Sequence, residues 1–151
     1  MQGARCVLAN DIDSAAAEAL KLNFSLNCPD SAINSSDVLR SGFNVSTNDF
    51  LCDSMKNDSS NSSILSQCTW DFIILGDMFY DEHMTKALKG FLRRAKSPAT
   101  RIILGDPNRG FLNSFNNLRI LHKYELPKQC ILENYGHTTA LVMEACETKT
   151  V

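Results

Sequence analysis

Two short apolar runs in this chain end abruptly at acidic residues, and each is followed by a pattern typical of a helix. The first run covers residues 5–9 and meets Asn10-Asp11-Ile12-Asp13, and the second covers residues 70–75 and meets Gly76-Asp77. A short run that is apolar throughout is typical of a strand buried on both faces, as in a parallel sheet. Both runs are therefore predicted to be strands whose carboxyl ends open into polar turns.

A helix is predicted after each of these turns. Asp13 or Ser14 can cap the first helix, which Pro29 ends, and Asp81 can cap the second, which Pro98 ends. Apolar residues recur at helical spacing in both segments. They are Ala15, Ala19, Leu22 and Leu26 in the first helix, and Met84, Leu88, Phe91, Leu92 and Ala95 in the second.

Weaker signals extend the alternation of strands and helices. Strands are predicted at residues 43–45, 101–104, 118–126 and 138–145, and the turn-rich stretch 127–137 indicates an antiparallel return without a clear helix. The polar stretch 52–69 is predicted to be a mobile surface insertion rather than a domain boundary. The chain is thus predicted to be a single α/β domain over 1–151, with a mostly parallel sheet and an antiparallel C-terminal strand pair.

Composition excludes several classes of protein. The chain has 151 residues and a formal net charge of −2, so no basic field attracts nucleic acid or an anionic membrane. The apolar runs are too short to span a bilayer as helices, and the N-terminus lacks the apolar region of a secretory signal. The six cysteines show no zinc-binding spacing, so free thiols and no metal site are predicted.

Several catalytic motifs are absent from the sequence. It holds no G-x-S-x-G, no G-x-x-x-x-G-K-[ST] and no H-E-x-x-H, so the hydrolase, nucleotidase and metalloprotease interpretations lose their usual support. His83, His122 and His137 fall in separate elements without a partner at metal or triad spacing, and surface histidines are the simpler interpretation.

The residues that end the strands are the first candidates for a site, because ligands of open α/β sheets bind at the carboxyl ends of the strands. Asp11 is placed to accept hydrogen bonds from both hydroxyls of a ribose. The alternative is that Asp11 or Asp13 only caps the following helix.

The segment from Asp77 to Tyr80 places a carboxylate, two large apolar side chains and a phenol directly after the strongest strand. Such a group suits an amine, because the carboxylate can hold an ammonium while aromatic faces stabilise the cation. The alternative is a turn in which Phe79 and Tyr80 fill the core.

Two strings carry a resemblance to a known family. LANDID at residues 8–13 and LGDMFYD at residues 75–81, with Gly105-Asp106-Pro107 and Arg109 later in the chain, resemble the electron-transfer-flavoprotein β-subunit lysine methyltransferases. The resemblance implies a Rossmann-like, seven-stranded class I methyltransferase sheet. It also implies transfer of a methyl group from S-adenosyl-L-methionine to lysine side chains of a mitochondrial flavoprotein subunit.

The resemblance also assigns roles to residues. Asp11, with Asp13 beside it, matches the ribose-binding turn of the cofactor site, and Asp49 matches the position that contacts the adenine. Asp77 and Tyr80 match the D-x-x-Y motif that holds the substrate lysine. Met78 and Phe79 lie between them and complete the predicted substrate-binding segment.

The sequence departs from the family at its start. It begins just before the family's second strand, so the first strand and its glycine-rich loop are expected to be missing from between the first and third strands seen here. The chain alone is therefore expected to bind S-adenosyl-L-methionine weakly or not at all. The alternative function is a catalytically inactive methyltransferase-fold protein that acts as a protein-binding module.

Two further expectations depend on the same resemblance. A dehydrogenase fragment is the weakest interpretation, because it leaves the segment from Asp77 to Tyr80 unexplained. The mitochondrial matrix is the expected location, with the cytoplasm as the alternative, and the oligomeric state stays open.

Overall fold

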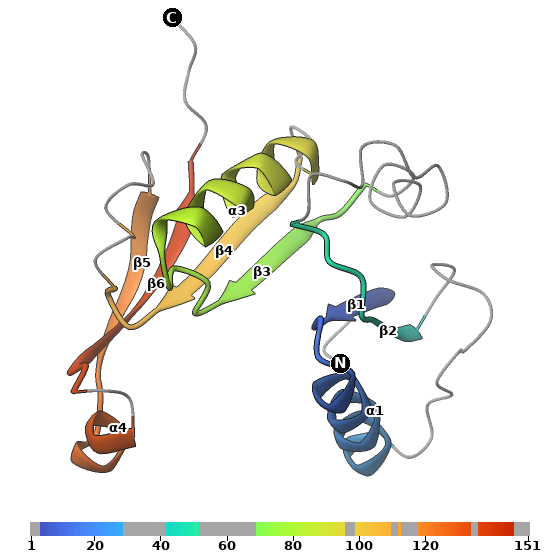
Figure 1. The fold of residues 1–151 in the computed structure, drawn as a ribbon, viewed down its shortest axis with the longest axis horizontal. Helices are drawn as coiled ribbons and strands as arrows, with labels where there is room; N and C mark the ends of the chain where they lie inside the picture. The colour runs from blue at the N-terminus through green and yellow to red at the C-terminus, as the bar shows by residue number, and fades with distance from the viewer. Residues whose placement is uncertain are drawn as a thin grey trace, which may run out of the picture. The chain divides into compact units, whose positions relative to one another are not determined.

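The computed structural model describes residues 4–28, 42–51, 69–95, 99–109, 112, 118–133 and 136–146. The chain divides into two compact units, residues 1–68 and 69–151, which are described separately (Figure 1). The single domain over 1–151 stays a prediction, and the predicted insertion at 52–69 lies outside the described residues except for residue 69. Among the described residues, no helix combines the length and apolar character needed to cross a membrane.

The first unit contains two parallel strands and a helix that follows the first of them. Strand β1 (Cys6–Asn10) pairs with β2 (Gly42–Ser46), with Val7 opposite Phe43. Helix α1 (Ser14–Asn27) follows β1 in the chain. Parallel neighbours need a crossover connection, so the strand–helix–strand order predicted from the sequence is confirmed here.

The buried face of α1 differs from the predicted one. Ala17 and Phe24 are buried, and the Phe24 ring stacks on Phe43 of β2 with centroids 4.3 Å apart. Leu22 and Leu26 of the predicted stripe are 59% and 70% exposed. The prediction was wrong because Ala17 and Phe24, seven residues apart, share the helix face that meets the aromatic ring of β2.

The second unit contains a four-stranded sheet with the order β3-β4-β6-β5. Its elements are β3 (Phe72–Gly76), α3 (Glu82–Ala95), β4 (Arg101–Asp106), β5 (Leu118–Glu125), α4 (Lys128–Glu133) and β6 (Thr139–Ala145). Strands β3 and β4 are parallel, whereas β6 is antiparallel to both β4 and β5. The antiparallel C-terminal pair predicted from the sequence is confirmed, with β6 between β4 and β5.

Helix α4 corrects the prediction that residues 127–137 form a return without a helix. Pro127 precedes the helix and its carbonyl accepts the N–H of Ile131 at 3.1 Å. Gly136 has a φ of 83° and donates its N–H to the carbonyl of Ile131, which closes the end. A proline before and a left-handed glycine after are typical limits of a helix, and six residues were too few to show a period.

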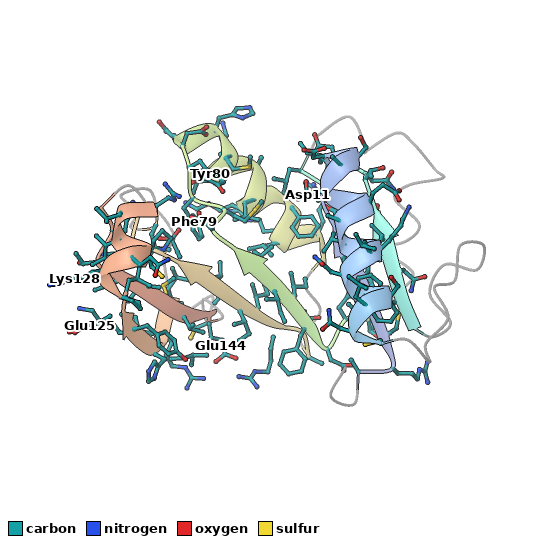
Figure 2. The ribbon with its side chains drawn as sticks, turned by 90° about the horizontal axis from the view of Figure 1, so that it is seen from below. Asp11, Phe79, Tyr80, Glu125, Lys128 and Glu144 are labelled. Carbon is teal, nitrogen blue, oxygen red and sulfur yellow. The ribbon has the colours of Figure 1, made fainter. Side chains whose placement is uncertain are left out.

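Helix α3 covers one face of the four-stranded sheet (Figures 1 and 2). Leu88 and Leu92 of α3 are buried, as are Ile102 and Leu104 of β4. Each fully buried side chain of this size contributes about 1.5–3 kcal/mol. Since side chains alternate along a strand, Asp106 continues the inner face of β4 and brings a carboxylate to the end of this core.

Candidate functional site

The turn after β3 has an unusual backbone. Asp77 has a φ of 49°, in the left-handed region that few residues other than glycine adopt. Its N–H donates to the carbonyl of Gly105 at 2.7 Å, which ties the turn to the end of β4. A non-glycine residue held in this conformation is a feature that clusters at functional sites.

The segment from Asp77 to Tyr80, which is predicted to suit an amine, has side chains both in the core and at the surface. Phe79 is 1% exposed and lies in the core, whereas Tyr80 is 54% exposed at the start of α3 (Figure 2). Met78 is half-buried. Asp81 caps α3 as predicted, because its Oδ1 accepts the N–H of Met84 at 2.7 Å. The core-filling interpretation is therefore correct for Phe79, while Tyr80 stays available at the surface.

Arg109 forms a two-point ion pair with Asp77. Its Nε donates to Oδ1 at 2.7 Å and its Nη2 donates to Oδ2 at 2.8 Å. The guanidinium also lies over the Tyr80 ring, 4.8 Å from its centroid. The sequence indicates Arg109 only as part of the resemblance, without a role. Its signal was its place just after β4, because parallel neighbours end at the same edge of a sheet.

The turn after β4 aims Arg109 at Asp77. Asp106 is 3% exposed, and its Oδ1 accepts the backbone N–H of Arg109 at 2.6 Å. Asn108 between them has a φ of 68°, which turns the chain sharply. The other oxygen of Asp106, Oδ2, is buried and has no hydrogen-bond partner among the described residues.

The charges of this group oppose one another. The hydrogen bond from Arg109 holds the pKa of Asp77 below its ordinary value against the effect of burial, and the charges of Arg109 and His137 act in the same direction. Pairing with Asp77 raises the pKa of Arg109. Burial raises the pKa of Asp106, and the charge of Asp77 adds to that rise. Asp77 is thus ionised and compensated, whereas Asp106 is harder to ionise than an ordinary aspartate.

The predicted cofactor residues lie in the first unit. Asp13 caps α1, since its Oδ1 accepts the N–H of Ala15 at 2.8 Å. Asp11 follows β1 and its Oδ1 accepts the N–H of Asp13 at 3.0 Å. The capping interpretation is therefore correct for Asp13, while Asp11 remains exposed at the end of the strand.

Asp49 follows β2, at the same edge of the small sheet. Its Oδ1 accepts the N–H of Leu51 at 3.0 Å. Asn10 joins the two strand ends, because its Nδ2 donates to the carbonyls of Ser46 and Asn48. The two carboxylates that the resemblance assigns to ribose and adenine thus follow neighbouring parallel strands. Among the residues that the structure describes, no group of three metal-ligating side chains comes together.

Comparison with known proteins gives relatives of one kind. No family model matches the chain. It is 34% identical over 146 residues to the electron transfer flavoprotein beta subunit lysine methyltransferase of Danio rerio, and 34% identical to that of Homo sapiens. The Caenorhabditis elegans homolog is 35% identical over 152 residues. Each match includes 94% of this chain.

The chain is a relative of these lysine methyltransferases. The resemblance that the two strings indicated is thereby confirmed. The chain spans about half the length of the relatives it matches, namely 48%, 47% and 59% of the fish, human and nematode proteins.

A solved structure supports the fold. A Haemophilus influenzae protein provisionally assigned as a methylase matches with a TM-score of 0.51 and 16% identity. The match includes 95% of this chain and 74% of that one. At this identity the likeness shows the fold alone, an α/β sheet of the class I methyltransferase type, as the sequence predicted.

Proposed function

We propose that the chain is an S-adenosyl-L-methionine-dependent protein-lysine N-methyltransferase that acts on the electron transfer flavoprotein β subunit. The observation that carries the proposal is the strand-end group of Asp77 and Tyr80 in a relative of lysine methyltransferases. Since the proposed substrate is a mitochondrial subunit, the mitochondrial matrix is the proposed location.

The lysine side of the reaction falls to the turn after β3. The Asp77 side chain is 40% exposed while it is paired, so a donor from solvent can still reach it. Tyr80 adds an exposed aromatic ring at the same turn. A carboxylate next to an aromatic face is a chemical match for an alkyl amine, whose nitrogen donates while its methylene groups pack on the ring.

The cofactor side falls to the turns after β1 and β2. The residues fit the nucleoside part of S-adenosyl-L-methionine, because Asp11 is exposed and uses Oδ1 for a single backbone N–H, which leaves acceptor capacity for two hydroxyls. Asp49 would bind the adenine, and Asp13 supports the turn by capping α1. When bound, the cofactor supplies a methyl group activated by its attachment to a positively charged sulfur.

The chain's own residues have a limited chemical task. Methyl transfer is an in-line displacement that needs an uncharged amine and correct alignment. No covalent intermediate on the protein is required. Asp77 would orient the lysine nitrogen by accepting one of its N–H groups, and Tyr80 would exclude water from one side.

The experiment combines the full chain with purified electron transfer flavoprotein β subunit and a high concentration of S-adenosyl-L-methionine, because the chain is expected to bind this cofactor weakly. Mass spectrometry of the subunit is expected to show methyl groups on lysine. Asp77→Asn is expected to lower kcat/KM about a hundredfold, because it replaces the charged acceptor of the amine with a weaker amide oxygen and breaks the two-point pair with Arg109. Asp11→Asn is expected to raise the KM for the cofactor about tenfold or more, with little change for the protein substrate.

The matched control is Asp71→Asn, which changes an exposed aspartate at the opposite end of β3 and should leave the rate unchanged. Absence of methylation in a preparation that still binds the flavoprotein subunit would overturn the proposal. That result would favour the alternative, a methyltransferase-fold protein that only binds its partner.

A further inference from the structure

The two groups that suit a substrate cation already hold a cation of the chain itself. The guanidinium of Arg109 takes both oxygens of Asp77, at 2.7 and 2.8 Å, and lies over the Tyr80 ring. An amine that approaches Asp77 therefore meets a carboxylate whose charge is already compensated. Either it displaces Arg109 or it binds to the pair.

Several contacts favour binding to the intact pair. The Arg109 side chain is 21% exposed, and its backbone N–H is fixed to the buried carboxylate of Asp106. Displacement would break two charge-assisted hydrogen bonds, which are the strong ones among protein hydrogen bonds. The Asp77 side chain is 40% exposed in the paired state, and each carboxylate oxygen has a second lone pair. A further donor can therefore reach Asp77 without moving Arg109.

We propose that Arg109 stays paired with Asp77 when the lysine binds, and that this makes the site select the uncharged amine. This inference rests on the proposed function and deepens it. Arg109 is a positioning residue here, because it acts on the lysine through Asp77.

The physical reason lies in the charge that the lysine meets. A lone carboxylate stabilises the ammonium and would raise the pKa of a bound lysine above its ordinary value of about 10.4. The ion pair carries no net charge, so it accepts an N–H of the amine without holding the additional proton. The other groups that act on Asp77 are His137 and Tyr80, which lower its pKa as Arg109 does, and Asp106, which opposes them when ionised.

The step balances without a further reactant. The lysine ammonium loses a proton to solvent, and the neutral nitrogen donates one N–H to Asp77. Its lone pair then forms the new bond to the methyl carbon. The bond from carbon to sulfur breaks with its electron pair on sulfur, and the methylated amine carries the positive charge.

The first test is the pH dependence of methylation of the flavoprotein subunit by the full chain and by Arg109→Gln. The variant keeps a planar donor and removes the charge. We expect the pH of half-maximal kcat to rise by about one unit, so that kcat near neutral pH falls about tenfold and recovers at high pH. The KM for the protein substrate is expected not to rise, because the ammonium form binds better to an uncompensated carboxylate.

Two further variants serve as controls for this test. Arg109→Lys keeps the charge without the two-point geometry and should shift the profile less than Arg109→Gln. Arg101→Gln removes a matched guanidinium–carboxylate pair, that of Arg101 with Glu144 at 2.7 Å, and should not shift the profile. A loss in Arg109→Gln that is uniform at all pH values would show a merely structural role and overturn the inference.

The second test needs no catalysis. Binding of n-butylammonium chloride to the full chain is followed by chemical-shift changes near Asp77. We expect Arg109→Gln to bind this cation about tenfold more tightly than the unmodified chain, and the further change Asp77→Asn to abolish the gain. Equal affinities in the unmodified chain and Arg109→Gln would overturn the inference even if the chain methylates its substrate. Tighter binding without methylation would uphold it and count against the proposed function alone.

Discussion

The turns after β1 and β3 have the same plan and different chemistry. In each turn one aspartate directly follows the strand: Asp11 follows β1 and Asp77 follows β3. A second aspartate, Asp13 or Asp81, then caps a helix of 14 residues. In the first turn the leading carboxylate accepts a backbone N–H and is exposed. In the second it is bound at both oxygens by Arg109.

Under the proposed function, this difference lets one local plan serve two kinds of ligand. An exposed and uncompensated carboxylate is a strong acceptor for neutral hydroxyls. A compensated carboxylate still accepts hydrogen bonds but stabilises a positive charge only weakly. It therefore suits an amine that must react in its neutral form. Whether the carboxylate is compensated depends on the turn after β4, which carries Arg109, and not on the residues that follow β3 themselves.

The largest expected difference between the two turns is in stability. Phe79 is 1% exposed, whereas Ile12 in the first turn is 65% exposed. We expect Phe79→Ala to lower the free energy of unfolding by about 3–5 kcal/mol, because it leaves a cavity beneath the turn. Ile12→Ala should cost at most about 0.5 kcal/mol. Urea unfolding of both variants measures the difference.

The same pair of variants can break the comparison. Equal costs for Phe79→Ala and Ile12→Ala would mean that the second turn is not held by the core. The conformation of Asp77 would then need another support, since its left-handed backbone depends on the turn being fixed.

A smaller effect is expected from the two helix caps. Asp13→Ala and Asp81→Ala should each lower the free energy of unfolding by about 1 kcal/mol, because each removes the acceptor for a backbone N–H in the first turn of its helix. Asp13→Asn and Asp81→Asn keep the accepting oxygen and should retain most of the stability. A cost confined to one of the two alanine variants would show that the turns share only their sequence pattern.

The sequence predicts β1, β3 and β4 and the helices α1 and α3 well, because these strands are short apolar runs and each of these two helices has an aspartate cap. The sequence pattern is less informative where residues distant in the chain decide which side chains are buried. The outward side of α1 carries Leu22 and Leu26, which looked like a core stripe, but the ring of Phe43 selects the face of Phe24. No local pattern contains that information.

The candidate site likewise depends on residues that are distant in the chain. Asp77 and Tyr80 were found from their position after a strand, while the partner that changes their chemistry, Arg109, lies 32 residues from Asp77 in the chain. Its approach depends on the parallel pairing of β3 with β4 and on the turn that Asp106 holds. The burial of Asp106 is likewise a result of strand alternation in three dimensions.

The smallest expected effect concerns acid. The pKa of Asp77 in the folded chain lies below the ordinary aspartate value of 3.8, so its pairing stabilises the fold above pH 3.8 and that contribution is lost as the pH falls through the lowered pKa. Since the pair is partly exposed, Asp77→Asn should cost under about 1 kcal/mol near neutral pH. The difference from the unmodified chain should vanish in strong acid.

Two aspartates make this acid measurement specific. Asp106 has a raised pKa, so its ionisation lowers the stability of the fold as the pH rises above 3.8. This effect has the opposite sign and is smaller in Asp77→Asn, because the charge of Asp77 adds to the rise in the pKa of Asp106. Asp11→Asn keeps the Oδ1 that accepts the N–H of Asp13 and should change stability by no more than a few tenths of a kcal/mol. Urea unfolding of the three proteins from neutral pH to strong acid provides the comparison. A cost of Asp77→Asn that persists in strong acid would mean that shape, and not charge, joins Asp77 to Arg109, and the contrast between an open and a compensated carboxylate would then fail.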